Sequence, residues 1–147
     1  MSDTLDAVLR LVRAQAALVR RFDSRLSGLH GVSLADFTLL LRLSQAPGGR
    51  MRRVDLAEAL GMTASGVTRG LAPLERIGLV TREPDARDAR VAYASLTATG
   101  RRRLREMTAT AEETASEIFT APVWNGETLT QLSTLLTRLG GTGLTGD

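Results

Sequence analysis

Two short helical patterns separated by a tight turn limit the possible folds of this chain more than any other feature. Residues 54–60 form the first pattern, and Gly61-Met62 is a turn signal. Thr63 is a typical N-cap for a second helix that ends near residue 77. Gly78 then occupies the position where a left-handed residue usually terminates a helix. This order predicts a helix-turn-helix.

A hairpin pattern follows directly. Residues 79–83 and 90–96 have strand-like composition and are joined by the polar segment 84–89. The central part of the chain is therefore predicted to be a helix-turn-helix followed by a wing, the name used here for this hairpin. The tip of the wing carries two aspartates, Asp85 and Asp88, among arginines. We expect the aspartates to pair with the arginines and fix the loop; a solvated, self-paired charged turn is the alternative.

Helical patterns flank this part. Residues 4–27 carry apolar stripes on two sides, which requires two partners: the core and a second subunit. An ordinary buried helix is the alternative. A break is expected over residues 27–32, followed by a capping box at Ser33 and Asp36. The remaining helices are predicted at residues 34–45, 98–120 and 126–139.

The second helix of the helix-turn-helix has two faces at about 100° per residue. Its predicted core positions are Val67, Leu71, Leu74 and Ile77. The opposite face carries Ser65, Arg69, Ala72 and Arg76, with Thr68 on the flank. Small polar residues allow close approach to a major groove, and Arg69 could reach guanine O6 and N7. The alternative to DNA contact for the two hydroxyl side chains is a capping role or simple exposure to solvent. The alternative for the two arginines is that they are solvated surface charges.

Composition excludes several classes of function. The 147 residues contain no Cys and one His, so disulfides, thiolate nucleophiles, catalytic triads and multi-His metal sites are not expected. Aromatic residues make up 3%, too few for a base-stacking platform. No apolar run is long enough to cross a membrane, and the N-terminus lacks a signal-peptide pattern, so we expect a cytoplasmic protein. All 19 basic residues are Arg, which suits phosphate recognition but also fits a genomic bias in codon use.

Several motifs together resemble the MarR family of bacterial transcriptional regulators. They are the runs 54–63 and 65–69, the segment 74–80, the wing motif Asp85-Ala86-Arg87-Asp88-Ala89-Arg90 and the segment 96–100. Two features depart from the common pattern. Arg52-Arg53 stands where a small polar residue often begins the short helix, and Pro73 removes an interior hydrogen bond from the second helix, which predicts a bend or loosening there.

The resemblance implies a mainly α fold with a small β-hairpin. Residues 1–147 would form a single MarR-type domain, with a winged helix-turn-helix at 33–97 and dimerisation helices at 4–27 and 98–139. It implies a homodimer on a pseudo-palindromic operator, with residues 64–72 in the major groove and Arg87 in the minor groove. Arg90 would support the wing or contact the DNA backbone. The DNA-binding residues expected are Thr63, Ser65, Gly66, Thr68, Arg69, Arg76, Arg87 and Arg90.

Family members often respond to small aromatic or phenolic effectors. The neighbourhood of such a pocket here would include Phe22, Leu26, His30 and Phe37, although a solvent-facing loop position is an alternative for His30. The leading hypothesis is a ligand-responsive repressor that binds double-stranded DNA as a homodimer. A winged-helix dimer that acts through protein–protein contacts, or without an effector, is the alternative. No enzymatic activity, catalytic residue, metal, cofactor or membrane partner is expected.

Overall fold

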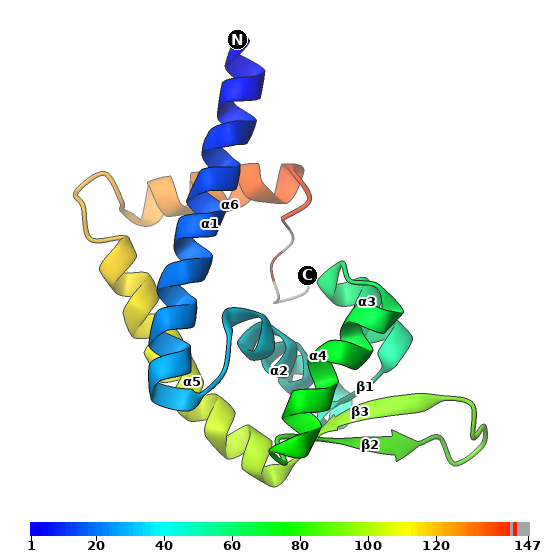
Figure 1. The fold of residues 1–147 in the computed structure, drawn as a ribbon. Helices are drawn as coiled ribbons and strands as arrows, with labels where there is room; N and C mark the ends of the chain where they lie inside the picture. Colours follow the sequence, from blue (N-terminus) through cyan, green and yellow to red (C-terminus); the bar gives the residue numbers. More distant parts are fainter. Residues whose placement is uncertain (142, 144–147) are drawn as a thin grey trace.

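The computed structural model describes residues 1–141 and 143. The fold is mainly helical with a small antiparallel sheet, which confirms the predicted fold class (Figure 1). The elements in chain order are α1 (Asp3–His30), α2 (Leu34–Gln45), the 3-10 turn η1 (Pro47–Gly49), β1 (Arg50–Arg52), α3 (Arg53–Leu60), α4 (Ala64–Arg76), β2 (Val80–Pro84), β3 (Ala92–Leu96), α5 (Ala98–Ile118) and α6 (Gly126–Arg138).

The sheet contains one strand more than the predicted hairpin. Its order is β1-β3-β2, and both pairings are antiparallel. β1 pairs Met51 with Ala94 and has only three residues, too few to give a recognisable period-2 pattern. Since β3 lies in the centre, its residues Ala94 and Leu96 are buried, and the base of the wing is anchored in the core.

The end of α1 differs from the sequence prediction. The break expected over residues 27–32 was wrong, because the helix continues to His30. Gly31 terminates it at φ 69°, and the Gly31 N–H donates to the carbonyl of Ser27. A single glycine such as Gly28 costs helix stability but does not stop a helix. His30 is thus the last residue of α1 rather than a loop residue.

The caps and core of the helix-turn-helix largely follow the sequence. The capping box of Ser33 and Asp36 is present, and Thr63 caps α4. Val67, Leu71 and Leu74 are buried as predicted. The prediction that Ile77 is a core residue was wrong: its side chain is 57% exposed. α4 ends at Arg76, so residue 77 no longer follows the helical periodicity.

The start of α5 packs closely against the turn after α4. A Cβ on Gly100 would lie 2.1 Å from the carbonyl oxygen of Leu79, whereas a Cβ on Gly28 would meet nothing within 4 Å. Thr97, the N-cap of α5, donates to the carbonyl of Gly78 at 2.7 Å and so ties the same corner together. This corner fixes α5 relative to α4 and the sheet.

Substitution of these two glycines should have opposite effects. Gly100→Ala should lower the free energy of unfolding by about 1–3 kcal/mol, because the methyl group must displace backbone atoms. Gly28→Ala should raise it by roughly 0.5–1 kcal/mol, since alanine loses less conformational entropy in a helix. Urea unfolding of both variants beside the parent chain measures the two changes. Equal stability of all three proteins would contradict the close packing at Gly100.

The N-terminal part of α1 and helix α6 lie at the end of the molecule away from the sheet (Figure 1). Exposed large apolar residues cover this part of α1, namely Leu5, Val8, Leu9, Leu11, Val12 and Leu18. α6 has no buried residue, and its Leu135 is exposed. Within the described part of the chain, these apolar side chains are left at least partly exposed to solvent. No helix in the described part of the chain is long and apolar enough to span a membrane.

The C-terminal half of α1 is held against α5 by charged side chains. Arg25 lies 3.2 Å from Glu117 and 3.3 Å from Glu113, and Arg21 lies 3.4 Å from Glu117. The hydrogen bond from Arg25 lowers the pKa of the Glu117 carboxyl, with its charge as a second cause. Because these groups are largely exposed, they orient the two helices more than they stabilise them.

Candidate nucleic-acid interface

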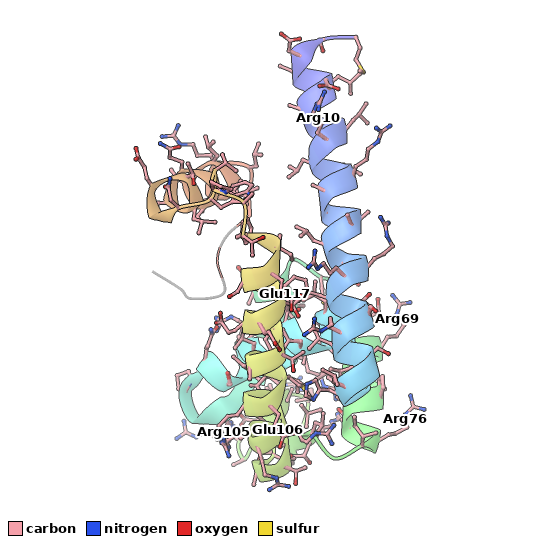
Figure 2. All side chains as sticks on the ribbon, turned by 90° about the vertical axis from the view of Figure 1, so that its left-hand side faces the viewer. Arg10, Arg69, Arg76, Arg105, Glu106 and Glu117 are labelled. Atoms are coloured by element: carbon pink, nitrogen blue, oxygen red, sulfur yellow. The ribbon has the colours of Figure 1, made fainter. Side chains whose placement is uncertain are left out.

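α4 presents the predicted polar face to solvent. Ser65, Thr68, Arg69, Ala72 and Arg76 are all exposed. Figure 2 shows Arg69 and Arg76 extending from α4 on the same side of the molecule. Neither guanidinium has a hydrogen bond or ion pair to another described residue. Two cations that neutralise no protein carboxylate remain available for phosphate or base contacts.

The start of α4 is a tightly organised turn. Thr63 Oγ1 accepts a hydrogen bond from the Gly66 N–H at 3.0 Å and lies 3.3 Å from Ser65 Oγ. A Cβ on Gly66 would lie 3.1 Å from Thr63 Oγ1, so a larger residue would crowd the cap. Thr63 and Gly66 thus build the turn themselves, while the Ser65 hydroxyl stays exposed.

Pro73 does not end α4. The helix continues through it to Arg76, and the Ile77 N–H donates to the Pro73 carbonyl at 3.2 Å. Proline has no N–H, so the carbonyl of Arg69 lacks the donor that residue 73 would otherwise supply. The missing backbone hydrogen bond therefore lies at Arg69, the central residue of the exposed face of α4.

The wing tip is shaped by its two aspartates in different ways. Asp88 pairs with the guanidinium of Arg90 at 3.1 Å, as expected. Asp85 instead accepts from the backbone N–H groups of Arg87 at 2.7 Å and Asp88 at 3.1 Å, so the expectation that it pairs with an arginine side chain was wrong. An aspartate that bonds N–H groups two and three residues ahead forms a local turn. The exposed side chain of Arg87 is thereby presented at the tip without a carboxylate partner among the described residues.

The charged groups of the wing predict that its tip loses its local order at low pH. Hydrogen bonds from the backbone of Arg87, then of Asp88, lower the pKa of Asp85 below its ordinary value of 3.8. The side-chain hydrogen bond from Arg90 lowers that of Asp88. Because these two pKa values are lowered, each carboxylate contributes fully to the stability of the folded wing above pH 3.8. This contribution is lost as the pH falls through the pKa of the same group in the folded protein.

Asp85→Ala should therefore loosen the wing tip at neutral pH, whereas Asp85→Asn, which keeps an acceptor oxygen, should loosen it less. Amide hydrogen exchange at Arg87 and Asp88 measures this directly, since these are the two donors. In the parent chain the order of the tip should be complete at pH 5 and decline only as the pH falls below 3.8. Unchanged exchange in Asp85→Ala would show that the turn does not depend on the carboxylate.

The residues predicted around an effector pocket lie on two helices: Phe22, Leu26 and His30 on α1, and Phe37 on α2. Leu26 and Phe37 are part of the core, and Phe22 is half-buried against it. His30 Nε2 lies 2.8 Å from Thr110 Oγ1 and links α1 to α5. A separate cavity of about 260 Å³ lies between α1 and α2. Its lining residues are Val19, Asp23, Ser33, Leu34, Ala35 and Thr38.

Arg53, for which the sequence alone indicates no role, also lies near this surface. It begins α3, and its guanidinium donates to Glu75 at 2.8 Å and lies 3.5 Å from Thr68 Oγ1. Both contacts join residues far apart in the sequence, which a local pattern cannot reveal. Within the described ranges, no group of three or more His, Cys, Asp or Glu is placed to hold a metal ion.

The paired helices α3 and α4, followed by the β2–β3 wing, define a winged helix-turn-helix protein. Residues 30–91 match the model of the MarR family. The resemblance to the MarR family is thus confirmed over the helix-turn-helix and the wing tip.

Solved structures extend the likeness to nearly the whole chain. AbsC, a MarR family transcriptional regulator from Streptomyces coelicolor, is 26% identical with a TM-score of 0.83, over 95% of this chain and 94% of AbsC. Sco3205, a MarR family transcriptional regulator from the same organism, was solved in complex with DNA. It is 24% identical with a TM-score of 0.86, over 95% of this chain and 88% of Sco3205. The transcriptional regulator BldR from Sulfolobus solfataricus is 28% identical with a TM-score of 0.74, over 94% and 99%.

Proposed function

We propose that this protein is a transcriptional regulator that binds double-stranded DNA in a sequence-dependent manner. The observation that carries the proposal is the exposed face of α4, where Arg69 and Arg76 have no carboxylate partner among the described residues, beside a wing tipped by Arg87. The match to the MarR family model supports it. So does the fold shared with Sco3205, which has been solved in complex with DNA.

The proposed contacts divide by type. Arg69 reads a base edge in the major groove, with Ser65 and Thr68 beside it contacting bases or phosphates. Arg87 enters the minor groove, where the negative potential attracts arginine. Arg76 contacts a backbone phosphate. Thr63, Gly66 and Arg90 complete this surface: Thr63 and Gly66 form the cap of α4, and Arg90 braces the wing through Asp88.

The protein acts as a homodimer in this proposal. Its whole length forms one MarR-type domain, in which the winged helix-turn-helix at 33–97 is flanked by dimerisation helices. The exposed apolar residues of α1 and the unburied leucines of α6 support this assignment, because apolar surface of this extent is usually covered by a partner. A two-fold dimer would place two copies of α4 on adjacent half-sites of a pseudo-palindrome.

We also propose that the protein is a bacterial, cytoplasmic repressor whose DNA binding responds to a small aromatic or phenolic ligand. Phe22 and His30 are only partly buried near the junction of α1, α2 and α5, which supports a site there. A ligand acts by favouring a dimer geometry that cannot span both half-sites. Release of bound DNA on addition of phenol and benzoate derivatives, with the dimer intact, tests this part.

Selection of bound sequences from a random DNA pool, repeated at two salt concentrations, tests the main proposal. We expect an inverted repeat whose half-site centres lie about 34–36 Å apart along the duplex. Binding that depends on salt but not on sequence would mean that the arginines make only generic phosphate contacts. In that case a protein partner of the dimer should be sought instead.

A further inference from the structure

The two departures from the MarR pattern, Arg53 and Pro73, are connected in the structure. Arg53 is the first residue of α3, and its side chain is only 19% exposed. It crosses to α4 and contacts Thr68 and Glu75. These two residues lie on either side of Pro73 and about two turns apart on one face of the helix. A single guanidinium therefore spans the point where α4 lacks a backbone hydrogen bond.

We infer that Arg53 is a positioning residue that braces α4 across Pro73 and so sets the presentation of Arg69 to DNA. The inference rests on the proposed function for its DNA-binding consequence, but the brace itself is a property of the free protein. Removal of the donor at residue 73 frees the carbonyl of Arg69 and lets the two halves of α4 move relative to each other. The contacts of Arg53 to both halves oppose that motion.

The geometry of the contact favours arginine specifically. A guanidinium presents several N–H donors in a rigid plane, so it can hold two acceptors at a fixed separation, whereas a lysine ammonium on a flexible stem cannot. Here Nη2 donates to Glu75 at 2.8 Å and Nη1 faces Thr68 Oγ1 at 3.5 Å. Thr68 also donates to the carbonyl of Ala64, which ties the brace to the first turn of α4.

The energetics indicate a role in geometry rather than in stability. The Nε of Arg53 is buried without a hydrogen-bond partner among the described residues, which costs free energy. An ion pair in such a site is weak evidence for stabilisation, and orientation is the better-supported role. A rotation of α4 by about 10° moves a side chain at its surface by roughly 1 Å. Such a shift is enough to weaken a bidentate contact of Arg69 to a base.

The test is a double-mutant cycle between Arg53→Lys and Pro73→Ala, measured on the full chain with the selected DNA and with unrelated DNA. Arg53→Lys should reduce affinity for the selected sequence about tenfold, because Arg69 is misplaced. Affinity for unrelated DNA and the salt slope should not change, since the positive charge remains. In the Pro73→Ala background, where the backbone bond is restored, the same substitution should cost less than about threefold. Arg10→Lys, an exposed exchange on α1, is the control and should change neither affinity.

Hydrogen exchange without DNA provides the second arm. The amides of Leu74 and Glu75 should exchange faster in Arg53→Lys than in the parent chain, and Pro73→Ala should abolish the difference. An equal loss of affinity on both DNAs would make Arg53 a generic contact to the DNA backbone and overturn the inference. Equal effects of Arg53→Lys in both backgrounds would overturn it too. If the parent chain selects no DNA sequence, the proposed function fails, and the exchange measurement alone decides whether the brace exists.

Discussion

Arg69→Ala should weaken binding to the selected operator by about 1–3 kcal/mol per half-site, roughly 5- to 150-fold, while leaving the dimer intact. The side chain lies on the exposed face of α4 and has no carboxylate partner among the described residues, so its removal disturbs little within the protein. Its loss should also relax the base preference at one position of each half-site. Fluorescence anisotropy with the selected duplex and with single-base variants measures both effects.

The matched comparison is Arg76→Ala, two turns further along the same face. If Arg76 contacts phosphate, this variant should weaken binding to all sequences alike and reduce the salt slope by about one. Arg10→Ala removes the same charge from an exposed pair on α1 and should have no effect on DNA binding. Equal weakening of specific and unrelated DNA by Arg69→Ala would contradict base readout by this residue.

The sequence predicted the order of the helices, the capping residues and the exposed face of α4, because these follow from local rules. The N-caps Ser33 and Thr63 needed only the residue type and its spacing from the next helix. The faces of α4 followed from helical periodicity except at Ile77, where the helix had already ended.

Features that depend on partners distant in the sequence could not be predicted in this way. β1 exists because Met51 meets Ala94 in the sheet, and Arg53 gains its role only where α3 packs on α4. The pairing of Asp85 with backbone rather than with an arginine depends on the path of the wing loop. The prediction of where α1 ends was wrong for a different reason. Gly28 resembles a helix terminator, but Gly31 is the residue that adopts the left-handed conformation.

The second large effect is expected at the surface that we assign to dimerisation. Val12→Glu should raise the dimer dissociation constant at least about 100-fold, because it places an unpaired carboxylate from each protomer in an apolar contact. Val12 is 55% exposed within one chain and lies among the other exposed apolar residues of α1. Ala17→Glu introduces the same charge on the opposite, polar side of α1 and is the control. Sedimentation analysis across a range of protein concentrations measures the dissociation constants.

Loss of the dimer should also reduce operator binding by about 10²–10⁴-fold, since the second half-site is then no longer bound at a high effective concentration. Each winged helix-turn-helix should remain folded, because its core residues Leu56, Leu71 and Leu74 lie far along the chain from α1 and are fully or almost fully buried within one protomer. A Val12→Glu protein that is dimeric and binds the operator normally would place the interface elsewhere. A monomeric protein that still binds the full operator tightly would instead show that one copy is sufficient for recognition, which would contradict the proposed two-fold arrangement.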